Sequence, residues 1–364
     1  MAKELWQDEN MDWVYNQLED EESKQIYDNR RKYLESGDYS YIENIIKKYC
    51  KGLEPYYEEK SKKKCIELKD KKVALWGGGK YGKHCIDLFS QNNVKVSYII
   101  DNDSSRWNQS YEGILIVSPE YFKNLVDNKE YYIVICSAFS VQEIRNQIIE
   151  NNILSEDNII TYSDFMQAAL KEQYFDEQIV TFSENEVWVD AGCYDFHTSD
   201  EFIKRLHKKK LDFRKIYAFE PDNIQYEVCK KRINDSGYKD KIELFKAGLW
   251  SSNRDICFES SGDGDSHVTG EEGSNKIKVI EFDSIEHDKV TFVKMDIEGS
   301  ELEALKGMEQ TICTDKPLLA VCIYHKYEDM WTIPMYLKKL VPEYRLFVRH
   351  YSNTKYETVL YAVI

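Results

Sequence analysis

The segment KMDIEGSELEALKG, residues 294–307, places two acidic side chains between a predicted strand and a predicted helix. The run VTFVKMD is apolar, whereas EGSELEALKG repeats apolar residues at helical spacing. Asp296 therefore ends the strand, and Gly299 permits a tight turn into the helix. In an open α/β sheet, such a turn lies beside the ligand. We expect the Asp296 carboxylate to face a bound molecule.

Two further acids, Glu298 and Glu301, fall at the start of the predicted helix. Acidic side chains in a first helical turn interact favourably with the helix dipole and can cap its free amides. A purely structural role and a role in the site therefore remain equally open for these two residues. For Asp296, the role in the site is favoured.

A second pair of strand-terminal acids narrows the choice of ligand. Asp190 ends VWVD and is followed by Gly192, and Glu220 ends IYAFE. A carboxylate at Asp190 would repel a pyrophosphate but suits a cationic ligand such as S-adenosylmethionine, which carries a sulfonium and an amino group. Glu220 can accept both ribose hydroxyls, in this cofactor as in NAD. The single glycine after Asp190 lacks the G-x-G-x-x-G pattern and favours the methyl donor.

Two histidines are the candidates for moving a proton. His325 ends CIYH and His350 ends VRHY, so both should lie on the same sheet edge as Asp296. A hydroxyl that accepts a methyl group needs a base, and we expect His325 in that role. Alternatively, Asp296, His325 and His350 could bind a divalent metal ion that orients the acceptor. Simple hydrogen bonding in a half-buried position is as plausible for His350.

The elements that position these residues form a strand-and-helix series beginning near residue 187. Seven apolar runs follow one another: VWVD, KIYAFE, IELFKAG, VTFVKMD, PLLAVCIYH, YRLFVRHYS and ETVLYAVI. Helix-length segments separate most of the first five, which predicts parallel strands with crossover helices. The last two are joined by the short NTKY and must form an antiparallel pair.

Six segments in this part of the chain resemble the FkbM family of S-adenosylmethionine-dependent methyltransferases: VDAGCYDFHTS, IYAFEPDN, KAGLWS, VKMDIEGSELEALKG, LAVCIYH and RHYSNTKYETVLYAV. The resemblance covers roughly residues 180–364. It implies an α/β fold with the seven-stranded class I methyltransferase sheet, whose last strand is antiparallel. It also implies O-methylation of a hydroxyl on a sugar, a nucleotide sugar or another small metabolite.

The same resemblance assigns roles around the cofactor S-adenosyl-L-methionine. Asp190 and Gly192 would face its methionine part, with Tyr194 next to the cofactor, Glu220 at the ribose, and Ala247 or Gly248 at the adenine edge, as these residues stand in this sequence. One position departs from the pattern, because Phe196 and His197 stand where such loops often have a second glycine.

An earlier glycine turn, ALWGGGKYGKHC, opens a separate βαβ series between residues 69 and 165. Gly77, Gly79 and Gly82 fit G-x-G-x-x-G, and Asp101 follows about twenty residues later. The segment resembles the small Rossmann-like, nucleotide-binding domains of sugar-modifying enzymes such as sugar acetyltransferases. A bound nucleotide and a purely structural role are both open. The alternatives for the whole chain are therefore an NAD-dependent oxidoreductase and a non-catalytic nucleotide-sugar-binding protein.

We expect a helical segment over 1–68, a Rossmann-like domain over 69–165 and a methyltransferase domain over 166–364.

Charge and apolar content limit the partners and the cellular location that we expect for this chain. Lys+Arg 49 against Asp+Glu 65 gives a net charge of -16, which disfavours a nucleic-acid partner. No segment has the apolar length of a signal peptide or a membrane span, so we expect a cytoplasmic protein without a membrane partner. The first helices could pack on the rest of the chain or on a second subunit, which leaves a homo-oligomer open.

Overall fold

The structure, a computed structural model, describes residues 2–50, 53–125, 128–137, 141–162, 170, 172–257 and 276–364. These residues form two compact units. The small unit comprises residues 53–162, and the large unit comprises the first 49 described residues together with those from residue 170 onward. We describe each unit by itself.

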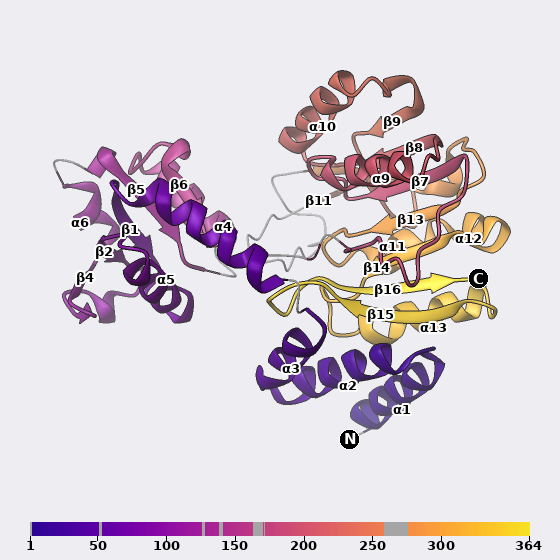
Figure 1. The fold of residues 1–364 in the computed structure, drawn as a ribbon, viewed down its shortest axis with the longest axis horizontal. Coiled ribbons are helices and arrows are strands. Elements are labelled where there is room, and N and C mark those ends of the chain that lie inside the picture. Colours follow the sequence, from indigo (N-terminus) through magenta and orange to yellow (C-terminus); the bar gives the residue numbers. More distant parts are fainter. Residues whose placement is uncertain are drawn as a thin grey trace. The chain divides into compact units, whose positions relative to one another are not determined.

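The large unit is built on a seven-stranded sheet in the order β15-β16-β14-β13-β7-β8-β9 (Figure 1). Its strands are β7 (Glu186–Ala191), β8 (Phe213–Phe219), β9 (Ile242–Phe245), β13 (Phe292–Met295), β14 (Leu318–Cys322), β15 (Arg345–His350) and β16 (Thr358–Val363). The first five are parallel, and β16 runs antiparallel to both of its neighbours. This topology confirms the expected class I plan with an antiparallel last strand.

Helices cover both faces of this sheet, so its central strands are buried on both sides. On β7, Val187 and Val189 belong to one core with helices α11 (Glu301–Lys306), α12 (Glu309–Asp315) and α13 (Asp329–Leu340). Trp188 points to the other core, where it stacks on Phe202 of α9 (His197–Lys208) at 4.6 Å between ring centroids. Helix α10 (Asn223–Asp235) lies on that same side.

The large unit also contains three N-terminal helices: α1 (Ala2–Gln17), α2 (Glu21–Ser36) and α3 (Ser40–Tyr49). Helices α2 and α3 cover edge strand β15, whose Val348 amide donates to Ser23 Oγ at 2.9 Å, and α1 packs on α13 and α2. The Tyr27 hydroxyl donates to the Met330 carbonyl at 2.9 Å. A covered edge strand is protected from pairing with another chain. The helical segment expected over residues 1–68 is thus divided, because α4 (Leu53–Leu68) belongs to the small unit.

A small side sheet completes the large unit. Its order is β10-β12-β11, with β10 (Gly248–Leu249), β11 (Arg254–Cys257) and β12 (Lys276–Ile280). The acidic, glycine-rich loop of residues 260–275 lies outside the described residues.

The small unit contains a six-stranded sheet in the order β3-β4-β2-β1-β5-β6. Its strands are β1 (Lys72–Trp76), β2 (Val96–Ile100), β3 (Ser110–Tyr111), β4 (Ile114–Val117), β5 (Tyr131–Ile135) and β6 (Ile159–Thr161). All pairings are parallel except that of β3 with β4. Helices α4 and α5 (Lys80–Gln91) pack on one face, and α6 (Pro119–Lys123) and α7 (Val141–Glu150) on the other. The glycine turn therefore connects β1 to α5, as expected from its motif.

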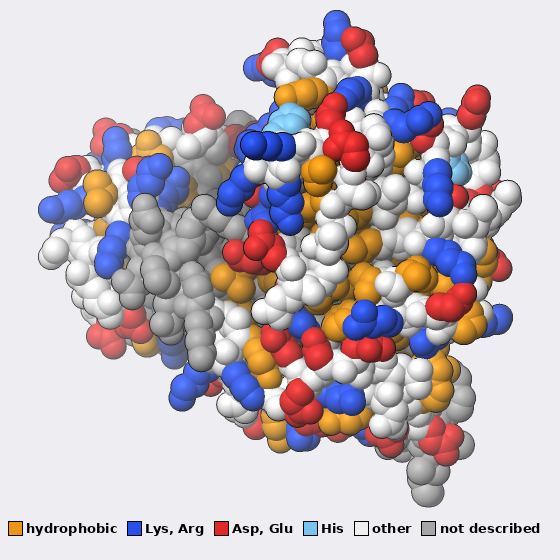
Figure 2. Space-filling model, turned by 45° about the vertical axis from the view of Figure 1, so that its right-hand side comes forward, with side chains coloured by type: hydrophobic (Ala, Val, Ile, Leu, Met, Phe, Trp, Pro, Cys, Tyr) orange, Lys and Arg blue, Asp and Glu red, His pale blue; other side chains and the backbone are white. Residues whose placement is uncertain are grey.

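The surface carries charges of both signs. On the face shown in Figure 2, Lys and Arg side chains are interspersed with Asp and Glu, and hydrophobic side chains lie between them. Among the described helices, none has the length and apolar character needed to cross a membrane.

Candidate active site

The carboxyl ends of β7 and β13 meet at the point where the strand order of the large sheet reverses. From β7 the chain continues to β8 on one side, while β13 and β14 lie on the other. The two strands are in direct register, with Asp190 opposite Lys294 and Ala191 opposite Met295. Ligands of open α/β sheets bind outside the carboxyl ends at such a point. The candidate site is therefore built by the loops that follow these strands.

Gly192 begins the loop after β7 and packs against the backbone of the loop after β13. Its φ is +76°, and a Cβ at this position would lie 2.0 Å from the Asp296 carbonyl oxygen. Only glycine allows this approach. The glycine was expected to admit a ligand, but in the structure it brings the two loops of the site together.

The rest of this loop holds non-glycine residues in left-handed conformations. Tyr194 has φ +50° and Phe196 has φ +67°. Phe196, which stands where a second glycine was expected, is fully buried, and its left-handed backbone leads into α9. Bulky residues rarely adopt such angles, and they persist where surrounding structure holds them, often at ligand sites.

Glu220 follows β8 and presents a carboxylate beside this loop. The Tyr194 amide donates to Oε2 at 3.0 Å, and the Asp222 amide donates to Oε1 at 2.9 Å. Burial raises the pKa of Glu220 to about 7, although both amides favour its charged form. Each oxygen accepts one of these amides, and a carboxylate oxygen can accept two hydrogen bonds. The side chain thus fits the task of holding two vicinal hydroxyls.

The residues expected at the adenine edge lie next to this position. Gly248 opens β10, and a Cβ built on it would lie 3.8 Å from the ring of Pro221, the residue after Glu220. Ala247 is buried in the core beneath.

Asp190 has a protein partner in place of the expected cationic ligand. Its side chain is fully buried, lies 3.0 Å from the Lys294 ammonium and accepts a hydrogen bond from Ser199 at 2.6 Å. Lys294 also donates to the Gly192 carbonyl at 2.5 Å. Burial would lower the pKa of Lys294, but Asp190 and Asp296 raise it above its usual value. Asp190 therefore holds Lys294 in place under the loop, and its charge does not require a ligand.

Asp296 lies after β13 at the centre of a polar cluster. The Tyr174 hydroxyl donates to its Oδ2 at 2.8 Å, and the Tyr324 hydroxyl donates to its Oδ1 at 3.2 Å. Burial would raise the pKa of Asp296, but His325, Lys294 and these hydroxyls hold it below its usual value. Asp296 is thus a carboxylate at the switch point of the sheet.

His325 sits among three acids. Its Nδ1 lies 2.9 Å from Glu301 Oε1, and its Nε2 lies 3.4 Å from both Asp296 Oδ1 and Glu298 Oε2. Burial would lower the pKa of His325, but these carboxylates raise it to about 10. The surrounding acids therefore favour the protonated form of the ring, whereas a base must be neutral. The base role of His325 stays a prediction.

Glu301 and Glu298, whose roles the sequence left open, differ in their burial. Glu301 is fully buried, accepts the Ile297 amide at 2.9 Å and contacts His325. The side chain of Glu298 is 55% exposed and has a backbone φ of +54°. Both acids therefore belong to the His325 cluster.

Two more buried acids lie near this cluster, and their neutral forms are favoured. Burial, followed by the charge of Glu301, raises the pKa of Asp329 to about 7. Burial, followed by the charge of Asp296, raises the pKa of Glu357 to about 7.

His350 lies at the same sheet edge, at the end of β15, but outside this cluster. The three side chains whose ligand atoms all lie within 4.8 Å of one another are Asp296, Glu301 and His325. His350 is buried, and its Nδ1 is paired with Thr358 Oγ1 at 2.8 Å. Burial lowers the pKa of His350 to about 3. The neutral ring acts as a core side chain, and the expected metal set including His350 is not formed.

Three side chains of the site were not singled out from the sequence. Lys294 was detectable as the one charged residue within the apolar run VTFVKM, and Tyr324 as the neighbour of His325. Tyr174 comes from a segment without a motif, 122 residues before its partner Asp296. Only the fold brings it to the site.

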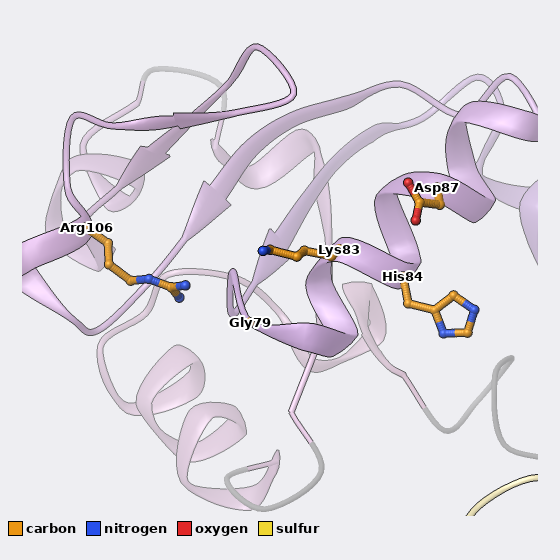
Figure 3. A pocket seen from close by; sticks show the side chains of 5 residues that line it. All are labelled: Gly79, Lys83, His84, Asp87 and Arg106. Carbon is orange, nitrogen blue, oxygen red and sulfur yellow. The ribbon is translucent and has the colours of Figure 1, made fainter. Parts of the chain in front are cut away.

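The small unit has a cavity of about 570 Å³ beside its glycine turn, lined by Gly79, Lys83, His84, Asp87 and Arg106. Figure 3 shows Lys83 and Arg106 extending toward each other from opposite sides of Gly79. Asp101, expected to accept ribose hydroxyls, instead accepts from the Gly78 amide at 3.1 Å and from Arg106 at 2.8 Å. Gly82 packs closely against the start of the turn, because a Cβ added to it would lie 2.2 Å from the Gly77 carbonyl oxygen.

Comparison with known proteins finds a similar family for a part of each unit. Residues 190–353 match the Methyltransferase FkbM domain, and residues 69–160 match the family described as C2185-like, N-terminal. Neither match supports an oxidoreductase. Hexuronic acid methyltransferase AglP of Haloferax volcanii is 35% identical over 103 residues, which are 27% of this chain and 42% of that protein. The match thus spans less than half of the relative's length.

Two solved structures are similar to this chain. The methyltransferase FkbM from Methylobacillus flagellatus is 19% identical, with 83% of this chain and 93% of that one covered and a TM-score of 0.48. A methyltransferase from Streptococcus mutans in complex with SAH is 9% identical, with 53% and 96% covered and a TM-score of 0.32. The large unit thus contains a match to the Methyltransferase FkbM domain over residues 190–353, and its seven-stranded sheet has the order given above.

Proposed function

We propose that the large unit transfers a methyl group from S-adenosylmethionine to a hydroxyl of a sugar or a similar small metabolite. The observation that carries this proposal is the Glu220 carboxylate. It stands after β8 beside the glycine loop of the sheet's switch point, where each oxygen accepts one backbone amide and can accept a second hydrogen bond. That arrangement suits the two ribose hydroxyls of a nucleoside cofactor.

S-adenosylmethionine supplies an electrophilic methyl group on a positively charged sulfur when bound. Glu220 holds the ribose, and the loop from Gly192 to Phe196 borders the cofactor. Asp296 contributes negative charge at the adjoining edge, where a cation is favoured. As the new carbon–oxygen bond forms and the sulfur–carbon bond breaks, its carboxylate can receive the proton of the acceptor hydroxyl. Because the methyl donor is reactive by itself, these residues accelerate the transfer by aligning and desolvating the reactants.

The acceptor class rests on the named relative, a hexuronic acid methyltransferase that matches over 103 residues. We extend this to a sugar hydroxyl acceptor for the present chain. The exposed Tyr194, with 64% of its surface accessible, offers an aromatic face at the mouth of the site. Such faces bind well to the apolar side of a sugar ring or to a sulfonium.

Calorimetric titration of the full chain with S-adenosylhomocysteine tests the cofactor site. Glu220→Gln removes the charge but keeps the shape, and we expect it to weaken binding by about 100-fold, because two hydrogen bonds to a charged group are weakened. Glu243→Gln is the matched control, since this acid on β9 pairs with Lys215 at the surface. No binding to the wild-type chain, or equal binding by both variants, would contradict the proposal. Transfer of a labelled methyl group to hexuronic acids, hexoses and nucleotide sugars then identifies the acceptor.

The small unit supports a second, separate function, the binding of an anionic ligand. Two cationic side chains, Lys83 and Arg106, face the cavity beside Gly79, at the N-terminus of the 12-residue helix α5. A helix N-terminus and nearby cations attract phosphate groups. The engagement of Asp101 by Arg106 argues against a dinucleotide bound through its ribose at this acid. We therefore propose a phosphate-bearing metabolite as the ligand.

A further inference from the structure

Arg30 of helix α2 is a buried cation without an acidic partner among the described residues. It is 2% exposed, and its Nη1 donates to the Lys355 carbonyl at 2.7 Å and to Thr358 Oγ1 at 2.8 Å. Within the described part of the chain, its Nε makes no hydrogen bond and its guanidinium forms no ion pair. A buried charge is costly unless an opposite charge compensates it. Arg30 therefore calls for an anion that these residues do not supply.

A second buried arginine in the same region has the partners that Arg30 lacks. Arg349 of β15 is 4% exposed, and its guanidinium lies 2.7 Å from Asp20, 3.2 Å from Asp176 and 3.6 Å from Glu22. Both arginines lie where α2 packs against the last two strands of the sheet (Figure 1). The missing counter-charge is thus particular to Arg30 and not a general feature of this interface.

The unused edge of the Arg30 guanidinium is a two-pronged donor. Both hydrogen bonds of the group come from Nη1, which leaves Nε and Nη2 without a partner in the described part of the chain. The N–H bonds of these two nitrogens run in parallel and match the two oxygens of one carboxylate. One carboxylate also balances the single positive charge. This edge therefore suits a carboxylate ligand.

Arg30 lies at the same sheet edge as Asp296. Thr358 begins β16, which is antiparallel to β14, so this residue stands at the carboxyl end of β14. Its carbonyl accepts the amide of the residue before Tyr324 at 3.0 Å, and the Tyr324 hydroxyl donates to Asp296 at 3.2 Å. Glu220, the residue assigned to the cofactor, follows β8 on the other side of the switch point. The acceptor must then approach from the side of β14 and β16, where Arg30 lies.

We propose that Arg30 binds a carboxylate of the methyl acceptor, which makes the acceptor a sugar acid and not a neutral sugar. This specificity rests on the proposed methyl transfer. Asp296 is a carboxylate at the same edge, so an acidic acceptor needs a compensating cation there. A phosphate monoester, with roughly twice the charge of a carboxylate, is repelled more strongly. The Lys355 carbonyl that Arg30 contacts belongs to a partly exposed segment, residues 353–357, so the guanidinium lies directly under the surface.

Calorimetric titration of the full chain, saturated with S-adenosylhomocysteine, tests this specificity. The probes are glucuronate and galacturonate, each compared with its neutral hexose, and glucose 6-phosphate. We expect the better acid to bind at least about tenfold more tightly than its hexose, because a hydrogen-bonded charge pair is lost in the hexose. Arg30→Gln should remove this preference by weakening the acid alone, and Arg30→Lys, which keeps the charge but not the fork, should restore part of it.

Arg31→Gln is the matched control, since this neighbour on α2 pairs with Asp12 and Glu35 and should keep the wild-type preference. Three results would overturn the role of Arg30: no preference for either acid in the wild-type chain, an equal loss for acid and hexose in Arg30→Gln, or tighter binding of glucose 6-phosphate than of both acids. The equal loss is what a purely structural arginine predicts. A wild-type chain that fails to bind S-adenosylhomocysteine contradicts the proposed methyl transfer, whereas a missing acid preference with that binding intact contradicts only the role of Arg30.

Discussion

Both units begin their sheets with a strand, a glycine turn and a helix, yet the acid after the second strand differs in what it contacts. In the large unit, Glu220 accepts two backbone amides, one on each oxygen. In the small unit, Asp101 is paired with Arg106 at 2.8 Å. The shared topology therefore presents a carboxylate bound by backbone amides in one unit and a carboxylate paired with an arginine in the other.

This difference separates the ligands that the two turns suit. A carboxylate with free lone pairs accepts hydroxyl groups, whereas a turn flanked by Lys83 and Arg106 attracts anions. The glycines of the two turns also differ in what they contact. Gly192 and Gly82 are required by close backbone packing, whereas Gly79 has open space around its Cβ position.

The sharpest contrast between the units concerns their ion pairs. Lys294→Ala would leave Asp190 charged and fully buried, and we expect a loss of about 3–5 kcal/mol in the free energy of unfolding of the large unit. Arg106→Ala in the small unit removes a partly exposed pair and should cost about 1 kcal/mol or less. Calorimetric melting of each variant measures both. Equal losses would show that burial does not distinguish the pairs.

The glycines of the two turns should also respond differently. Gly192→Ala combines a positive φ with a backbone clash, and we expect it to destabilise the large unit by about 2–4 kcal/mol. Gly79→Ala meets no atom within 4 Å and has φ -77°, so its effect should stay within about 0.5 kcal/mol. Denaturant unfolding compares the two. A harmless Gly192→Ala would mean that the two loops of the site do not pack as described.

The pH dependence of cofactor binding should reveal the state of Glu220. Its pKa of about 7 lies above the ordinary value, so the ionised fraction, which accepts the ribose hydroxyls best, rises as pH increases through 7. We expect the affinity for S-adenosylhomocysteine to increase about tenfold from pH 6 to pH 8. Glu220→Gln should abolish this trend. A trend that survives the substitution would assign it to another group.

The smallest expected effect lies in the small unit. Lys83→Gln should weaken binding of inorganic pyrophosphate by roughly fivefold, because an exposed cation contributes about 1 kcal/mol to an anion contact. Lys95→Gln, which removes an exposed charge outside the cavity, is the control. Neither change should affect S-adenosylhomocysteine binding. Unchanged pyrophosphate affinity in Lys83→Gln would remove the support for this ligand class.

Much of the fold was predictable because each strand appears as an apolar run of its own. The runs from VWVD to ETVLYAVI correspond to the seven strands, and the short NTKY connection required the antiparallel arrangement of the last two. Strand ends also located Glu220 and Asp296, since residues at the carboxyl ends of parallel strands share one edge. The division of residues 1–68 between the units was not predictable, because helices of similar composition carry no signal of what they cover.

The sequence by itself thus determined the order of elements, the two glycine turns and the strand-terminal acids, since these depend on local spacing. Only the tertiary structure decided their partners. Asp190 gained Lys294 from a strand 104 positions later, and His325 became enclosed by acids while His350 became a neutral core residue. Charge state and function of such side chains depend on burial and on neighbours distant in sequence, and both arise when the chain folds.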